Sequence, residues 1–461
     1  MIILDGTIVN VALPSIQSDL GFTQSDLAWV VNAYLIAFGG LLLLAGRLGD
    51  LIGRKRILIW GLAVFTAASL LCGLSVSPAM LVAARFVQGI GGAMSSAVAL
   101  GMIVTMFPEP REQARAFGIY SFVAAAGASI GLLAGGILTH ALSWHWIFFV
   151  NVPIGIAAAW LSARLVDSDP GIGLDKGADA PGAVLVTAAL MLGVYTIVET
   201  SRYGWVSADT IGFGVASVGL LVGFVVRQAT AKNPLLPLRM FQPRNVWGAN
   251  VIQLLAVAGM LGFFFMSSLY LQRVVGLDPL RIGLAFLPVA ITIGVLSLSW
   301  SARLTMRFGA RRVLLPALIL VATGLGLFTR MPVHSAYLID LLPGMLLLGV
   351  GMGLVFPSLA TLAMSSATTN DSGLASGLLN TTAQVGGALG LAILATVAAS
   401  HTSALLAGGE GPDVALAAGF RLVFAISASL IVVSLVLAVT VLRDAPSYAE
   451  AVMPEEEEDA A

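Results

Sequence analysis

Charged residues are scarce in this chain of 461 residues, and their scarcity excludes an ordinary soluble domain. Asp, Glu, Lys and Arg together make up 10% of the sequence, whereas soluble domains carry roughly 25%. The single cysteine, Cys72, cannot form an internal disulfide and has no zinc-type spacing around it. A net charge of -1 gives no reason to expect a nucleic-acid partner. We find no P-loop, metal-binding motif or Ser/His/Asp pattern, and we therefore expect neither an enzyme nor a resident cofactor or metal.

Long apolar runs take up most of the chain instead. Hydrophobic residues form 58% of the sequence, and its mean hydropathy is +0.97. Because a membrane-spanning helix needs about 20 mostly apolar residues, the pattern predicts an all-α polytopic membrane protein that lies in a lipid bilayer. We predict fourteen transmembrane helices, at residues 2–18, 27–46, 57–75, 79–104, 114–139, 147–166, 181–199, 208–227, 247–273, 279–302, 313–330, 337–363, 373–399 and 418–442.

The distribution of basic residues predicts the orientation of these helices. If the N-terminus is cytoplasmic, the cytoplasmic loops hold seventeen of the 23 Lys and Arg residues, and Arg85 lies within the membrane. The outer loops then hold only Arg202, Arg273, Arg281, Arg330 and Arg421. Since cytoplasmic loops carry the excess of basic residues, we expect both termini on the cytoplasmic side.

An internal repeat divides the chain into two halves. The segment GRLGDLIGRKR at 46–56 recurs as ARLTMRFGARR at 302–312, and LVAARFVQGIGGA at 81–93 recurs as LLPGMLLLGVGMG at 341–353. The offsets of 256 and 260 residues exceed the length of six spans by about one helical hairpin. We therefore predict a six-helix half at 1–166, two inserted helices at 181–227, a second six-helix half at 247–442 and an acidic cytoplasmic tail at 443–461.

The segment 46–56, called the hairpin below, joins the second and third predicted helices. We expect Gly46, Gly49 and Gly53 to allow close backbone approach and a tight turn, and Arg54 to Arg56 to hold the segment in the cytoplasm. Asp50 is acidic, so topology does not explain it, and we predict a gating contact with the facing helix end or with an arginine across the interface of the halves. The second copy has Met306 at the position of Asp50.

Three polar residues fall within apolar spans of the first half and are candidates for proton coupling. Arg85 and Gln88 lie in the fourth span, where an ionised side chain is costly unless it faces a cavity or a partner. Asp5 lies in the first span, and a carboxyl group in an intermittently wet cavity can exchange protons. The alternatives are that Asp5 caps the first helix and that Arg85 extends to the outer interface.

Four glycines, Gly127, Gly131, Gly135 and Gly136, fall on adjacent turns of the fifth span. Small residues at this spacing allow close helix packing, either as a simple contact or as a face that hinges between the halves. The sixth span opens with WHWIFFVNVPIG, in which the tryptophans suit an interfacial belt and Asn151 and Pro153 mark a polar or bent helix.

Taken in order, LDGTIVNVALP, GRLGDLIGRKR, RFVQGIGG, GASIGLLAGG and WHWIFFVNVPIG resemble the motifs of the fourteen-helix drug:proton antiporters of the major facilitator superfamily. The resemblance implies a proton-driven efflux pump with one alternating central cavity. It also implies that Asp5 is the acidic residue of the first helix and Arg85 the arginine of the proton relay. The chain departs from this pattern at Leu132, where the antiporters usually have proline, and at His145, where they usually have arginine.

The substrate and the setting are predicted in broader outline. The spans at 279–302 and 373–399 contain no acidic residue, so we expect neutral, zwitterionic or anionic amphiphiles rather than dications. Candidate residues for the substrate cavity are Asn10, Tyr34, Asn250, Gln253, Phe264, Asn380 and Gln384, although a phenylalanine run is often core instead. We expect a monomer in the cytoplasmic membrane of a bacterium. The alternatives to efflux are proton-coupled uptake of a nutrient and a non-transporting sensor on the same fold.

Overall fold

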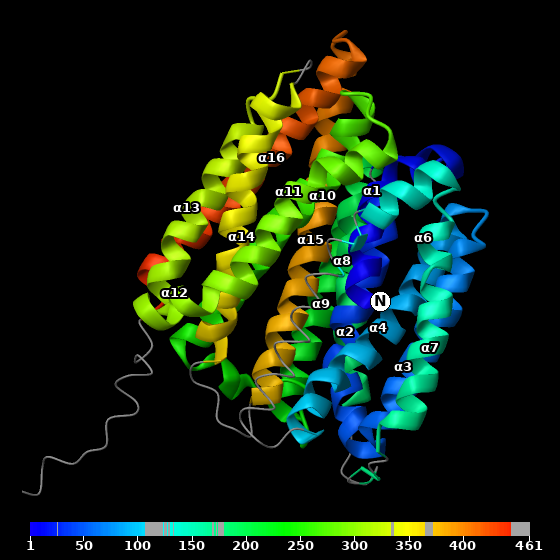
Figure 1. The fold of residues 1–461 in the computed structure, drawn as a ribbon, viewed down its shortest axis with the longest axis vertical. Helices are drawn as coiled ribbons and strands as arrows, with labels where there is room; N and C mark the ends of the chain where they lie inside the picture. The colour runs from blue at the N-terminus through cyan, green and yellow to red at the C-terminus, as the bar shows by residue number, and fades with distance from the viewer. Residues whose placement is uncertain are drawn as a thin grey trace, which may run out of the picture.

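In the computed structural model the chain folds into a bundle of long helices, with no β-strand in the part of the chain that the structure describes (Figure 1). The described residues are 1–24, 26–106, 123, 127, 130–131, 133–167, 170–171, 173, 179–332, 336–364 and 372–443. Leu132 and the tail beyond residue 443 therefore lie outside the described residues, as does much of the predicted fifth span.

The helices follow the predicted order along the chain. Those of the first half are α1 (Ile2–Leu20), α2 (Trp29–Ile52), α3 (Arg54–Gly73), α4 (Pro78–Met106), α6 (Trp146–Phe149) and α7 (Asn151–Leu165). The inserted pair is α8 (Ala180–Tyr203) and α9 (Ala208–Thr230). The second half contains α10 (Arg244–Arg273), α11 (Pro279–Val295), α12 (Ser301–Phe308), α13 (Ala310–Phe328), α14 (Leu342–Met364), α15 (Ser372–Ala407) and α16 (Pro412–Thr440).

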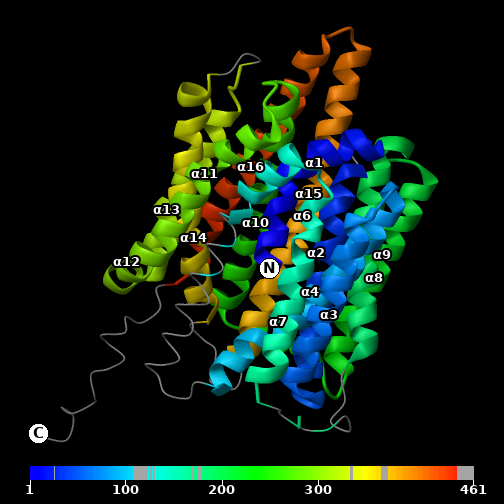
Figure 2. The same cartoon turned by 45° about the vertical axis from the view of Figure 1, so that its right-hand side comes forward.

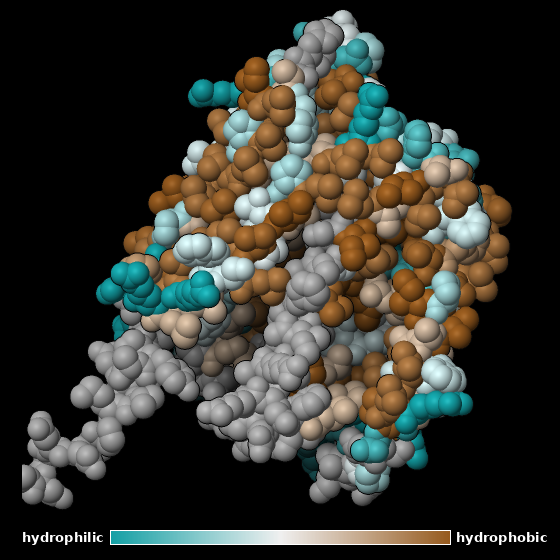
Figure 3. Space-filling model, in the orientation of Figure 1, coloured by the Kyte–Doolittle hydropathy of each residue, from teal (hydrophilic) through white to brown (hydrophobic). Residues whose placement is uncertain are grey.

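Twelve of these helical stretches are long and apolar enough to cross a membrane, and they match twelve of the fourteen predicted spans. Apolar side chains cover the middle of the surface, and polar ones gather toward its two ends (Figure 3). The first predicted span is a helix, α1, but it carries Asp5, Asn10 and Gln17 and is not among the twelve. The fourteenth helix would be the fifth span, of which residues 133–141 are described as helical.

The hairpin turns at one glycine only. α2 continues to Ile52, so Gly46 and Gly49 lie inside a helix and take no part in the turn. The expected close approach is found at Gly49, where an added Cβ atom would lie 2.5 Å from Val98 Cγ1 of α4. The chain reverses at Gly53, whose φ of 109° is a conformation that side chains disfavour. Gly309 has a φ of 87° at the equivalent place in the second half. The offset of 256 residues seen in the sequence is thus an offset between two identical backbone turns.

Helix packing repeats between the halves as well. A Cβ atom added to Gly91 of α4 would lie 2.8 Å from the carbonyl oxygen of Gly61 in α3. In the second half, a Cβ on Gly351 of α14 would lie 2.8 Å from the carbonyl oxygen of Ala317 in α13. Because such contacts require glycine, the repeated motif preserves the close approach of two helices.

The two halves meet along two seams. α1 contacts α10, where Ser268 Oγ donates a hydrogen bond of 2.7 Å to the carbonyl oxygen of Asn10. α2 contacts α15, where Gly39 lies against Gln384. At the hairpin end of the molecule, α12 lies on one side and α3 on the other in both views (Figure 1, Figure 2).

The inserted pair, α8 and α9, packs against both α2 and α15 through α8. Asp179 lies at the start of α8 and caps this helix by accepting a hydrogen bond of 3.1 Å from the Gly182 amide. Arg227 Nε and Gln228 Nε2 of α9 donate to the same carboxylate at 2.5 and 2.8 Å. Burial alone would raise the pKa of Asp179, but these donors outweigh it and hold that pKa below its ordinary value. The carboxylate therefore fastens the two inserted helices together.

Candidate functional site

The buried polar centre of the first half is an ion pair between α1 and α4. Arg85 Nη1 donates to Asp5 Oδ2 at 2.6 Å, and the two side chains are 1% and 0% exposed. Arg85 Nη1 also donates to Gln88 Oε1 at 2.6 Å, and its Nε donates to the Val30 carbonyl oxygen of α2 at 2.9 Å. The three candidates for proton coupling, which are 83 residues apart at most, therefore meet in one network.

The second oxygen of Asp5 is held equally firmly. Gln88 Nε2 donates to Asp5 Oδ1 at 2.9 Å, and Asn151 Nδ2 of α7 donates to it at 2.8 Å. Gln88 Nε2 also donates to Ser69 Oγ of α3 at 2.9 Å, and Ser69 Oγ donates to the Phe65 carbonyl oxygen at 2.7 Å. The carboxylate thus gathers donors from α4 and α7, while α3 fixes the orientation of the glutamine.

An aromatic wall closes the network on its remaining side. The Arg85 guanidinium lies 4.4 Å from the ring centroid of Tyr34 and 5.7 Å from that of Phe148, which is cation–π distance. Asn151 Oδ1 and the Tyr34 hydroxyl are buried without a hydrogen-bond partner.

The structure decides between the alternatives left open for Asp5 and Arg85. Asp5 does not cap α1, because Met1 occupies the cap position and the carboxylate faces other helices. Arg85 does not extend to an interface, because its side chain is buried and donates to Asp5, Gln88 and Val30 inside the bundle. Asn151 and Ser69 were not singled out as site residues. The only available signal for Asn151 was its place in WHWIFFVNVPIG, a polar residue at the start of an apolar helix.

The contact of Asp50 differs from the prediction. Asp50 Oδ1 accepts a hydrogen bond of 2.9 Å from Arg54 Nη2, which lies just past the turn at Gly53, at the start of α3. Both side chains are partly exposed, and the partner belongs to the same half rather than to the other. The turn at Gly53 brings the end of α2 and the start of α3 together, so this ion pair forms without a contact to the other half. The predicted gating contact across the interface is therefore not made in this structure.

The glycines of the fifth span lie against α1 and α11. A Cβ on Gly131 would lie 2.8 Å from the carbonyl oxygen of Leu4, and one on Gly135 would lie 2.7 Å from that of Ile8. Gly136 faces the other half, where its Cβ would lie 2.7 Å from the carbonyl oxygen of Pro279. Gly127 makes only ordinary contacts with the start of α1. Neighbouring residues of the fifth span therefore contact α1 and the second half.

Comparison with known families decides what kind of molecule this is. The family described as the Major Facilitator Superfamily matches residues 1–391. The chain belongs to this superfamily. The recognition made from the motifs is confirmed, and the protein is a multi-pass membrane transporter rather than an enzyme.

Several curated relatives of the chain are named for resistance or export. The chain is 39% identical over 410 residues to the puromycin resistance protein pur8 of Streptomyces alboniger, covering 88% of this chain and 81% of that protein. It is 40% identical over 405 residues to the cephamycin export protein CmcT of Amycolatopsis lactamdurans, covering 87% and 83%. It is 34% identical over 401 residues to the tetracenomycin C resistance and export protein of Streptomyces glaucescens, covering 87% and 74%. These relatives support efflux.

Solved structures of major facilitator proteins share the fold. A bacterial homologue of the human lysosomal transporter Spinster matches with a TM-score of 0.65 at 16% identity, over 95% of this chain and 93% of that one. A structure from a study of proton dependent oligopeptide transporters matches with a TM-score of 0.64 at 16% identity, over 95% and 97%.

The residues predicted for the central cavity of this major facilitator protein are scattered over its helices. Tyr34 belongs to the ion-pair network, and Asn10 lies at the α1–α10 seam with its amide bonded to the Gly6 carbonyl oxygen. Phe264 packs at 5.4 and 5.5 Å, centroid to centroid, on Phe263 and Phe286, as core side chains do. The side-chain amide oxygens of Asn250 and Gln253 are buried without hydrogen-bond partners. Asn380 and Gln384 lie on α15. Their role as cavity residues stays a prediction.

Proposed function

We propose that this protein exports drugs or other small amphipathic compounds across the bacterial cytoplasmic membrane in exchange for protons, by alternating access. The observation that carries the proton coupling is the fully buried Asp5–Arg85 pair. The export direction is supported by relatives that are named for antibiotic resistance and export. We propose that the protein works as a monomer with both termini in the cytoplasm and uses the proton gradient alone as its energy source.

Protonation of Asp5 is the step that would drive the conformational change. Two opposite charges about 4 Å apart attract each other by about 4 kcal/mol at an effective dielectric constant of 20. A shift of a two-state equilibrium from 1:99 to 99:1 requires about 5.5 kcal/mol. Loss of the carboxylate charge therefore changes the energy of the α1–α4 contact by an amount comparable to that needed to switch the transporter.

The surrounding side chains would keep this switch reversible. When Asp5 is protonated, Arg85 retains Gln88 Oε1 and the Val30 carbonyl oxygen as acceptors, so the guanidinium stays in place on α4. α1 is then less strongly held to α4, while its other side carries the Asn10 contact with α10 of the second half. Movement of α1 would thus transmit the protonation state to the interface of the halves.

The test is transport into inside-out membrane vesicles whose lumen is acidified. We expect wild-type vesicles to accumulate at least one of three probes, puromycin, a cephamycin and tetracenomycin C, and to lose this accumulation when the pH gradient is collapsed. Asp5→Asn keeps the size of the side chain but cannot carry the exchangeable proton, so gradient-driven accumulation should fall by about tenfold or more. Asp167→Asn, at an exposed aspartate after α7, should behave like wild type.

Two results would contradict the proposal. If no probe accumulates in wild-type vesicles with an acidic lumen, proton-driven export of these compounds is wrong. If Asp5→Asn vesicles accumulate a probe as well as wild type and still depend on the pH gradient, the proton is exchanged at another residue.

A further inference from the structure

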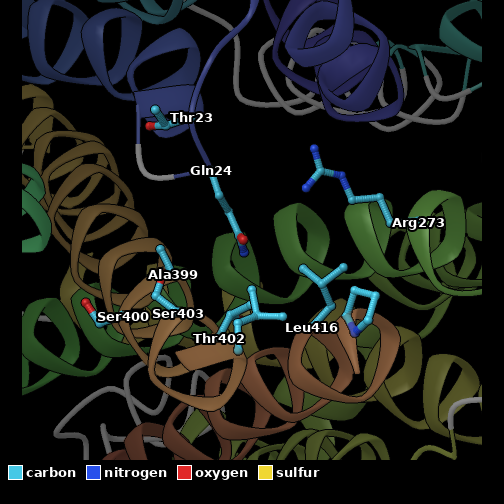
Figure 4. A pocket seen from close by; sticks show the side chains of 10 residues that line it. Thr23, Gln24, Arg273, Ala399, Ser400, Thr402, Ser403 and Leu416 are labelled. Atoms are coloured by element: carbon cyan, nitrogen blue, oxygen red, sulfur yellow. The ribbon is translucent and has the colours of Figure 1, made fainter. Parts of the chain in front are cut away.

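A cavity of about 560 Å³ opens at the end of the molecule opposite the hairpin. It is lined from both halves: Thr23 and Gln24 come from the α1–α2 connection, and the remaining residues come from α10, α15 and α16 (Figure 4). Those residues are Arg273, Ala399, Ser400, Thr402, Ser403, Leu406, Pro412 and Leu416. Because each half supplies part of the wall, this vestibule would change shape whenever the halves move relative to each other.

The polar lining of the vestibule consists of hydrogen-bond donors without an acidic partner. The guanidinium of Arg273 and the amide of Gln24 extend into the space from opposite walls (Figure 4). Gln24 Nε2 is buried and has no hydrogen-bond partner. Ser400 and Ser403 add hydroxyl groups from α15, and no Asp or Glu is among the lining residues. A site with this composition favours an acceptor that carries negative charge.

Within the described chain, Arg273 and Arg330 have no side-chain partner at this end of the molecule, and of these two only Arg273 lines the vestibule. Arg281 is paired with Asp278 at 3.3 Å, and Arg421 donates to the Met331 carbonyl oxygen at 2.7 Å. Within the described chain, the Arg273 side chain has neither an ion pair nor a hydrogen bond. The positive-inside rule does not account for a basic residue on the predicted outer side, so a ligand is the simplest reason for its position.

We propose that the vestibule binds the carboxylate, sulfonate or phosphate group of an amphipathic anion. Arg273 would pair with the anionic group, Gln24 Nε2 and the serine hydroxyls would complete its hydrogen bonds, and Leu406, Pro412 and Leu416 would cover the apolar part. The role of this site in transport rests on the proposed function, in which it would hold an exported compound before release. The binding itself needs no proton gradient.

Binding can be measured on the purified full-length protein in phosphatidylcholine nanodiscs. The probe is dansylglycine, a fluorescent carboxylate, and its neutral methyl ester is the matched ligand. We expect wild type to bind the acid about tenfold or more tightly than the ester, as a hydrogen bond between charged groups allows. Arg273→Gln should remove most of this preference, and Arg273→Lys should retain part of it.

The control variant is Arg330→Gln, at an exposed arginine of the same end that does not line the vestibule. It should preserve the preference for the acid. Equal binding of acid and ester by wild type, or an undiminished preference in Arg273→Gln, would overturn the proposal. The binding assay and the vesicle transport assay are independent. A negative binding result would not contradict proton-driven export, and a negative transport result would not contradict anion binding in the vestibule.

A lipid headgroup is the other source of such an anion, and a second set of nanodiscs separates the two. If the vestibule holds a soluble compound, replacing a third of the phosphatidylcholine with phosphatidylglycerol should leave the affinity for dansylglycine within about twofold. A loss of tenfold or more that disappears in Arg273→Gln would mean that the lipid occupies the site, and the assignment to exported compounds would be wrong.

Discussion

Removing the Arg85 guanidinium should destabilise the protein mainly because it leaves Asp5 buried without a counter-charge. Breaking a buried pair by deleting one partner costs about 3 to 5 kcal/mol. Arg85 makes three hydrogen bonds, and only the bond of 2.6 Å to Asp5 depends on the carboxylate. The bonds to Gln88 and to the Val30 carbonyl oxygen are lost whatever residue 5 is, at about 1 kcal/mol each. About 1 to 3 kcal/mol of the loss from Arg85→Gln should therefore be recovered when Asp5→Asn is also present.

A double-mutant cycle measures this coupling. Wild type, Asp5→Asn, Arg85→Gln and the double variant would be unfolded reversibly in mixed micelles with rising fractions of denaturing detergent, followed by tryptophan fluorescence. We expect the double variant to be about 1 to 3 kcal/mol more stable than the sum of the single changes implies. Additivity within about 0.5 kcal/mol would refute the view that the pair is a tightly coupled unit. The same cycle with Arg330→Gln in place of Arg85→Gln should be additive.

Two further variants test other contacts. Asp179→Asn should lower the free energy of unfolding at pH 7 by about 1 to 2 kcal/mol. This is toward the lower end of what hydrogen bonds to charged groups contribute, because Arg227 is partly exposed to solvent. Because the folded-state pKa of Asp179 lies below its ordinary value of 3.8, its contribution is complete above that value and is lost as the pH falls through the lowered pKa. The difference in free energy of unfolding between Asp179→Asn and wild type should therefore disappear in acid. The control variant Asp167→Asn should match wild type at every pH. Gly136→Val should push the fifth span away from Pro279 and increase the distance between spin labels placed at the exposed positions 76 and 339. Gly219→Val, which has open space around it, should leave that distance unchanged. An unchanged distance in Gly136→Val would contradict a role for Gly136 in closing the vestibule end of the molecule.

The sequence supported the fold and the choice of Asp5 and Arg85 as candidate residues because both depend on local rules. Apolar runs located twelve of the described spans, and most of their ends agree with the structure within a few residues. The cost of burying a charge pointed to Asp5 and Arg85. The repeat also located Gly53 and Gly309, since a backbone turn with positive φ has few alternatives to glycine.

What the sequence could not supply depends on how helices rotate and cross. Whether Asn151 of α7 reaches Asp5 depends on the azimuth of two helices about their axes, which apolar periodicity leaves undetermined when most faces of a helix are apolar. The partner of Asp50 was undetermined for a related reason, because Arg54 lies just past the turn at Gly53 and is as available as an arginine of the other half. The gating role of Asp50 stays a prediction. The outer vestibule needs a connection and three helix ends to converge, which no single segment indicates.

Cys72 gives the molecule a native chemical reporter. It is the one cysteine in the sequence, it is buried, and its Sγ lies 3.7 Å from Gln88 Oε1 in the ion-pair network. A thiol reagent can reach it only when α3 and α4 separate enough to admit water. The rate at which the unaltered protein is alkylated, with and without a proton gradient, would therefore count the openings of the network directly, without an engineered label.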